Sequence, residues 1–112
     1  MDYQITKMTA HHQLSLEEVV EHLKKQEPGE LVAEIPRPSD GQKVVLLVFE
    51  RYYWRNGSYA NLTVLLTETP ELQTADIVGS GGGEGLLNFS WGANEHFAEK
   101  AAGILAECGF HE

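Results

Sequence analysis

The chain contains KVVLLVFERYYWR at residues 43–55, then the dipeptide Asn56-Gly57, then SYANLTVLLT at residues 58–67. Both runs are rich in β-branched and aromatic residues, which favour strands. Asn-Gly is the dipeptide that best satisfies the positive φ angles of a two-residue type I′ turn. The sequence therefore predicts an antiparallel hairpin with a two-residue turn, in which Trp54 faces Tyr59 and Leu47 faces Leu66.

The two faces of this predicted hairpin differ in composition. Alternate residues form one continuous apolar face, which we expect to be the core: Val45, Leu47, Phe49, Tyr53, Ala60, Leu62, Val64 and Leu66. The other face mixes aliphatic, aromatic and polar side chains: Leu46, Val48, Glu50, Tyr52, Trp54, Tyr59, Asn61, Thr63, Leu65 and Thr67. Because half of this second face is apolar, we expect a loop, a ligand or another subunit to cover part of it.

Three aromatic residues on the second face, Tyr52, Trp54 and Tyr59, are candidate contacts for a ligand or partner, together with Asn61. Tyr and Trp are enriched in binding surfaces because they combine a large contact area with few rotors and a polar tip. The alternative is that these rings only pack across neighbouring strands of a curled sheet.

Composition limits the classes of partner. The chain has 112 residues, of which 42% are hydrophobic, and this size predicts a single domain over residues 1–112. A formal net charge of −9 disfavours binding to nucleic acid or to an anionic membrane surface. We find neither a signal-peptide pattern at the amino terminus nor an apolar run long enough to span a bilayer, so we expect a soluble, cytoplasmic protein.

A first helix is predicted after Leu14. Ser15 is placed as N-cap, Glu18 completes a capping box, and Pro28-Gly29 ends the helix. An apolar stripe runs along it at helical spacing: Leu16, Val19, Val20 and Leu23.

The remaining elements are assigned more briefly. We expect strands at residues 3–8, 31–35, 72–79 and 86–91, a loop at residues 36–41, and a last helix from Ala93 to Cys108 with Gly109 at its C′ position. The fold class is then α+β: a mainly antiparallel sheet of about five strands with both helices packed on one face.

A glycine-rich segment, VGSGGGEGL at residues 78–86, is the second unusual feature. It fits neither the Walker A pattern, because no lysine follows, nor the dinucleotide pattern, whose third glycine is missing in every frame. The structural interpretation is a bulged turn between strands. The functional alternative is a small-ligand or catalytic site made by Gly81, Gly82, Gly83, Glu84 and His96.

Other chemistry has little support in the sequence. The histidines lack metal-binding spacing, and Cys108 stands alone in an apolar helical pattern, so we expect no metal, no cofactor and a cysteine that packs in the core. No catalytic residue is assigned, and an enzyme is the less favoured class.

The chain resembles a family of small bacterial proteins classed as a domain of unknown function. The resemblance lies in Val48-Phe49-Glu50-Arg51-Tyr52-Tyr53, in the Val-Gly-Ser-Gly-Gly-Gly segment from Val78, and in Trp91-Gly92-Ala93. It covers roughly residues 15 to 110. It implies a compact α+β domain in a bacterial cytoplasm and supplies no activity. The sequence thus favours a non-catalytic binding module or homodimer that uses the aromatic sheet face, with the glycine-loop pocket as the alternative.

Overall fold

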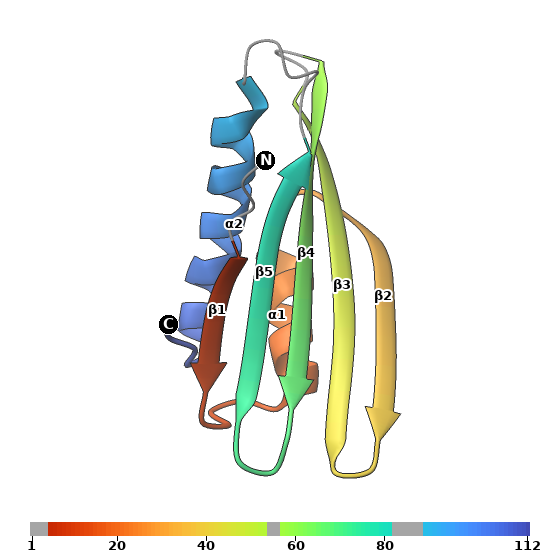
Figure 1. Cartoon of the computed structure of the whole chain (residues 1–112), viewed down its shortest axis with the longest axis vertical. Coiled ribbons are helices and arrows are strands. Elements are labelled where there is room, and N and C mark those ends of the chain that lie inside the picture. The colour runs from red at the N-terminus through yellow and green to blue at the C-terminus, as the bar shows by residue number, and fades with distance from the viewer. Residues whose placement is uncertain (1–4, 54–56, 82–88) are drawn as a thin grey trace.

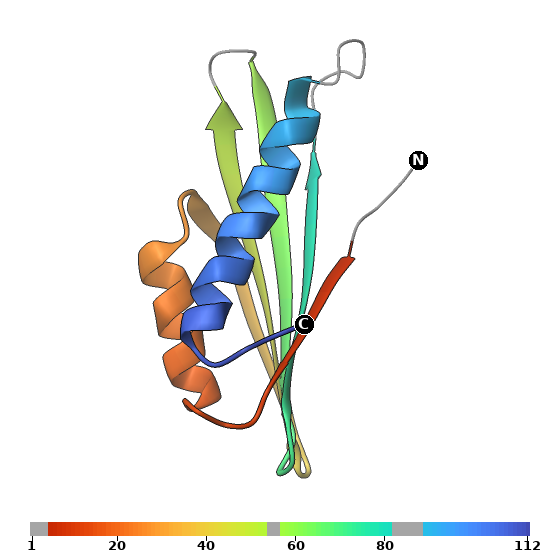
Figure 2. The same cartoon turned by 90° about the vertical axis from the view of Figure 1, so that its left-hand side faces the viewer.

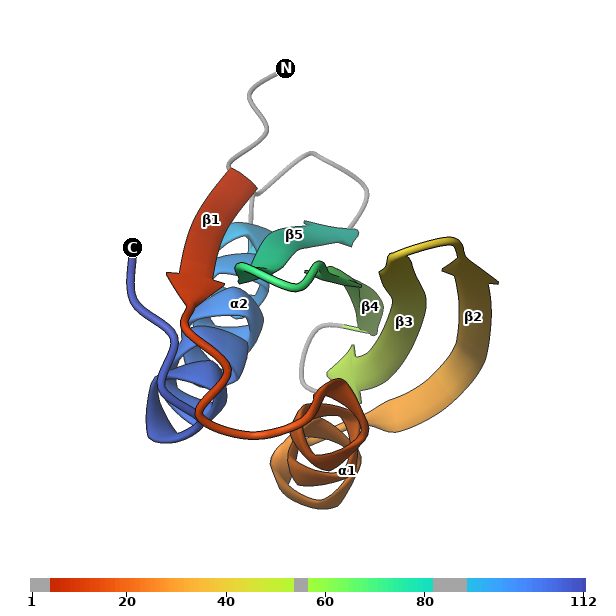
Figure 3. The ribbon, with the colours of Figure 1, turned by 90° about the horizontal axis from the view of Figure 1, so that it is seen from below.

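A single five-stranded antiparallel sheet carries two helices on one of its faces (Figure 1). The structure is a computed structural model that describes residues 5–53, 57–81 and 89–112, with the side chains at positions 53, 58 and 89–96 outside the described part. The elements are β1 (Ile5–Ala10), α1 (Leu16–Gln26), β2 (Glu30–Ser39), β3 (Gln42–Tyr53), β4 (Ser58–Glu68), β5 (Gln73–Gly81) and α2 (Phe89–Glu107). The strand order is β1-β5-β4-β3-β2, so β4 lies at the centre and β1 and β2 form the edges. The predicted α+β class and the placement of both helices on one side are confirmed (Figure 3).

The central hairpin forms, but its predicted register is wrong by two residues. Tyr52 pairs with Tyr59, Leu47 with Val64, and the last pair is Tyr53 with Ser58. The connection therefore spans four residues, 54–57, rather than two. Gly57 keeps the positive φ of +66° that the turn demands. Because side chains alternate with a period of two, this shift leaves the strand residues whose side chains are described on their predicted faces.

The first helix starts and stops where the sequence predicts. The Ser15 hydroxyl accepts a hydrogen bond from the Glu18 N–H at 3.1 Å, and the Glu18 carboxylate accepts one from the Ser15 N–H at 3.0 Å. At its far end the chain turns through Gly29, whose φ is +122°. A β-carbon there would lie 2.9 Å from the ring of Phe97, so α1 leaves toward β2 through a position that only glycine fits well.

The largest differences from the predicted boundaries are at the end of β2 and at the start of α2. β2 continues to Ser39, through Pro36 and Pro38, where a loop was expected. Prolines fit an edge strand when their nitrogens point away from the ladder, and β2 is such an edge. The strand predicted at residues 86–91 is wrong from Phe89 onward, because that residue already begins α2. The end of α2 is as expected: Gly109 has φ +93°, and Phe110 N–H donates to the Leu105 carbonyl at 3.0 Å.

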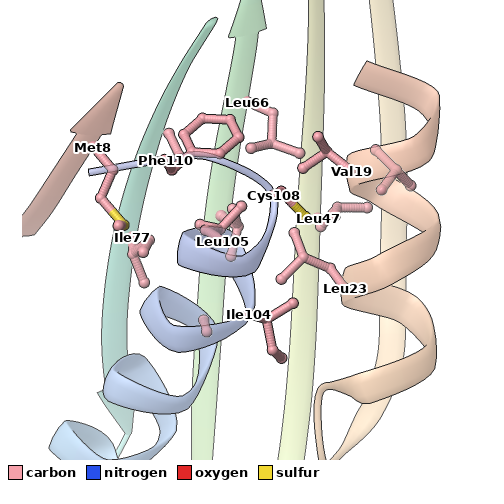
Figure 4. Close-up of a cluster of buried hydrophobic side chains, with 14 of the residues drawn as sticks. Met8, Val19, Leu23, Leu47, Leu66, Ile77, Ile104, Leu105, Cys108 and Phe110 are labelled. Atoms are coloured by element: carbon pink, nitrogen blue, oxygen red, sulfur yellow. The ribbon is translucent and has the colours of Figure 1, made fainter. Parts of the chain in front are cut away.

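The core lies between the helices and the sheet (Figure 4). Both helices contribute side chains that face the predicted apolar side of the hairpin. Buried residues from all layers include Met8, Leu16, Val19, Leu23, Leu47, Phe49, Leu62, Val64, Leu66, Ile77, Phe97, Leu105, Cys108 and Phe110. Cys108 is fully buried, so the prediction that it packs in the core is confirmed.

The carboxyl-terminal segment returns to the sheet (Figure 2). Thr9 of β1 and His111 exchange two backbone hydrogen bonds of 2.8 Å each. Through this bridge, His111 pairs with Thr9 near the end of β1 and adds one residue to that edge of the sheet.

Candidate functional site

The sheet face opposite the helices, hereafter the open face, is the candidate site. Figures 2 and 3 show α1 and α2 on one side of the sheet, with no described element across the other side. The strand registers give the residues that share the open face: Ile5, Lys7, Thr9, Glu30, Ala33, Ile35, Arg37, Val44, Leu46, Val48, Glu50, Tyr52, Tyr59, Asn61, Thr63, Leu65, Thr67, Thr74, Asp76, Val78 and Ser80.

Two transverse rows make the middle of the open face apolar. One row runs Ile35, Leu46, Leu65 and then Asp76 and Lys7 across the five strands. The next row runs Ala33, Val48, Thr63, Val78 and Ile5.

The side chains of these rows are accessible to different degrees. Leu46, Leu65 and Val78 are half-buried by their strand neighbours, whereas Ile5 on β1 is 54% exposed and Ile35 on β2 is 36% exposed. A solvated antiparallel sheet face normally carries polar residues. The two central rows therefore carry more aliphatic side chains than a solvated sheet face usually does.

A tyrosine pair extends the apolar strip toward the hairpin end. The rings of Tyr52 and Tyr59 lie 4.8 Å apart between centroids and are tilted by 50°. They do pack across strands, as the alternative interpretation expects, yet Tyr52 is 49% exposed and Tyr59 is 51% exposed. Neither ring lies beneath a helix, so both keep an accessible edge for a partner.

The described open face carries charges of both signs, Lys7 and Arg37 against Glu30, Glu50 and Asp76. Lys7 Nζ lies 3.7 Å from an Asp76 carboxylate oxygen, so these two charges of the central row offset each other. Most of the exposed carboxylates of the helical layer belong to Glu17, Glu18, Glu21, Glu99 and Glu107. The acidic surface and the apolar open face are therefore on opposite sides of the domain.

Both edges of the sheet have a feature that hinders the addition of a strand. Pro36 and Pro38 are two residues apart, so their nitrogens share one side of β2 and withhold two donors from its free edge. The ladder between β2 and β3 also shifts register between Leu31 and Ala33. At the opposite edge, His111 occupies the backbone groups of Thr9.

The sequence-predicted site residues separate into two groups. Tyr52, Tyr59 and Asn61 come together on the open face, at the hairpin end of β3 and β4. Trp54 lies outside the described residues. Gly81 ends β5 and pairs with Ala60. Of the other glycine-loop predictions, Gly82, Gly83 and Glu84 lie outside the described residues, and His96 is in α2 with its side chain outside them.

Glu27, which the sequence analysis did not single out, is a buried carboxylate at the C-cap of α1. It is 5% exposed, and among the described residues neither of its carboxylate oxygens has a hydrogen-bond partner. Burial raises its pKa from the usual 4.5 to about 8, against the opposing effect of the Lys100 and Arg51 charges. One signal was present in the sequence, because Glu27 follows Leu23 by four residues and so continues the apolar stripe.

A groove of about 330 Å³ lies between α1 and the strands β2 and β3. Its apolar lining includes Leu16, Val20, Pro36 and Val45. The lysines beside it are paired: Lys43 lies 3.2 Å from Glu17, and Lys24 lies 3.1 Å from Glu34. The groove is at the small end of the range for ligand sites, and we assign no ligand to it.

Within the part of the chain that the structure describes, no three His, Cys, Asp or Glu side chains cluster closely enough to hold a metal ion. Neither described helix combines the length and the apolar character needed to cross a membrane.

Comparison with known proteins identifies the family. A family model described as Family of unknown function (DUF6054) matches residues 5–109. The chain belongs to this family. The match confirms the resemblance to a family of unknown function, while the glycine-rich segment as its signature and a bacterial origin stay predictions. Searches among curated proteins and among solved structures gave no match. For this DUF6054 protein, function must therefore be argued from the site itself.

Proposed function

We propose that this DUF6054 protein is a non-catalytic interaction module that binds another protein chain through the open face. The observation that carries the proposal is the apolar strip across all five strands, which no described element of the chain covers. A surface of this kind loses contact with water when a partner packs on it, and that loss is the main driving force for protein association.

The chemistry of the open face supports binding rather than catalysis. Its polar groups near the tyrosine pair are the amide and hydroxyl groups of Asn61, Thr63 and Ser80 and one carboxylate, that of Glu50. Amide and hydroxyl groups donate and accept hydrogen bonds without carrying charge, so they are suited to hydrogen bonding at an interface. Tyr52 and Tyr59 supply the aromatic contact area that interface centres favour.

Photo-cross-linking in cells that produce the protein tests this proposal. A benzoyl-phenylalanine at position 52 replaces one exposed aromatic ring by another on the open face. The same group at Lys25, which is exposed on α1, is the matched control on the helical side. We expect a covalent adduct with a protein chain from position 52 and none from position 25. Adducts from position 25 alone, or from neither position, would overturn the proposal.

A further inference from the structure

We infer that the partner is a second copy of this chain, and that the two sheets pack face to face about a two-fold axis. This inference rests on the proposed function, because it names the occupant of the open face. Face-to-face packing of antiparallel sheets about 10 Å apart is the arrangement of β-sandwiches. Two copies would form a four-layer assembly with the helices outermost.

The size of the open face fits a dimer interface. Five strands at a spacing of about 4.8 Å give a width of about 24 Å, and seven residues along a strand give about 24 Å of length. The flat area is then on the order of 600 Å², and the accessible area of a surface with protruding side chains is larger. Stable interfaces bury about 800 Å² on each partner. One whole sheet face therefore supplies about the area that a specific dimer needs.

The distribution of charge also favours this arrangement. With a formal net charge of −9, two copies repel each other unless they meet where charge is low. Packing through the open face places the exposed carboxylates of α1 and α2 on opposite outer surfaces of the dimer. On the central rows of the open face, the described charges are Lys7 and Asp76, which pair within one copy. Over the whole described open face, Lys7 and Arg37 stand against Glu30, Glu50 and Asp76, a net charge of −1 compared with −9 for the chain.

The geometry singles out one residue at the centre. β4 is the third of the five strands, and Thr63 is the middle residue of Ser58–Glu68. A two-fold axis relating two fully overlapping faces lies between the sheets and maps the centre of one face onto the centre of the other. Whether the axis runs along the strands or across them, Thr63 of one copy faces Thr63 of the other. This symmetry gives a test that a different partner cannot satisfy.

The test is a charge-swap mixing experiment on the full chain. Thr63→Lys and Thr63→Glu are each purified, and mass in solution is measured for wild type, for each variant and for their equimolar mixture. Lys25→Glu is the control for a charge change on the helical side. Thermal melts verify that each variant is folded. If a Thr63 variant does not fold, Leu65→Lys, whose residue lies in the neighbouring row on β4, replaces it in the experiment.

We expect wild type and Lys25→Glu to have twice the 12.5 kDa chain mass. In each Thr63 variant alone, like charges meet at the axis, so the dissociation constant of the dimer should rise at least 100-fold. In the mixture, opposite charges meet, so the dissociation constant of the mixed dimer should be at least tenfold lower than that of either variant alone. A monomeric wild type, a dimer that Thr63→Lys and Leu65→Lys both leave intact, or folded Thr63 variants whose mixture stays monomeric would each overturn the inference. If the dimer is overturned, a cross-linked adduct from position 52 whose mass differs from that of two copies of the chain would still support the interaction module. The absence of any adduct from position 52 would overturn both the dimer and the interaction module.

Discussion

Replacing Glu27 with Gln should remove most of the alkaline loss of stability in this domain. The carboxyl group of Glu27 has a pKa of about 8 in the folded chain and about 4.5 when unfolded, because folding buries it without a hydrogen-bond partner. A group whose pKa rises on folding stabilises the protein below its unfolded value. That contribution is lost as pH rises through the folded value.

The magnitude follows from these two pKa values. Each pKa unit corresponds to about 1.36 kcal/mol, and between pH 6 and pH 9 the folded protein gives up a proton that the unfolded chain has already released. The free energy of unfolding should fall by about 2.7 kcal/mol over this range from Glu27 alone. A neutral glutamine of similar shape has no proton to lose. The advantage of Glu27→Gln over wild type should therefore grow by about 2.7 kcal/mol from pH 6 to pH 9.

Urea unfolding followed by circular dichroism at pH 6, 7, 8 and 9 measures this difference. Glu107→Gln, an exposed carboxylate at the end of α2, is the matched control and should follow wild type at every pH. Stability curves of wild type and Glu27→Gln that stay parallel across the range would refute the reasoning. They would mean that Glu27 is ionised and solvated in the folded protein.

Three further substitutions test the fold by urea unfolding at neutral pH. Ser15→Ala removes the hydroxyl that caps α1 and should cost about 1 kcal/mol; no measurable loss would mean that the capping box does not stabilise the helix. Phe49→Ala opens a cavity at a position that is 1% exposed and should cost about 3–5 kcal/mol, and a cost below about 1 kcal/mol would place this ring outside the core. Gly29→Ala puts a β-carbon 2.9 Å from Phe97 at a positive φ, so it should destabilise by about 1–3 kcal/mol, and a neutral or stabilising result would contradict the tight turn after α1.

The hairpin shows which parts of the fold the sequence could predict. Leu47, Phe49, Leu62 and Val64 belong to a continuous apolar face, whereas their alternating neighbours mix aliphatic, aromatic and polar side chains; this difference predicts which face is buried, and all four are buried. The dipeptide at the reversal does not determine how many residues lie between the strands, so the predicted register differed by two from that observed. The faces were correct because a shift of two preserves the alternation.

Strand ends and the buried carboxylate were harder to predict. Pro36 and Pro38 indicate a loop locally, and their place in an edge strand depends on the order of the strands in the sheet, which sequence periodicity does not give. Glu27 reads as a polar end of a helix until α2 packs against it. Tyr52, Tyr59 and Asn61 were predicted together on one surface because they lie on a single hairpin, whereas Ile5 and Ile35 join that surface only through the five-strand order.

The central claim is that the open face is covered by a second copy in solution. Methyl NMR with a soluble paramagnetic probe measures it directly, through the relaxation that the probe adds to Leu46, Leu65 and Val78 at high and at low protein concentration. The exposed methyl group of Ala106 on α2 is the internal reference. We predict that the open-face methyl groups are shielded relative to Ala106 at high concentration and become accessible on dilution. Equal accessibility at both concentrations, with a mass of one chain throughout, would contradict the account.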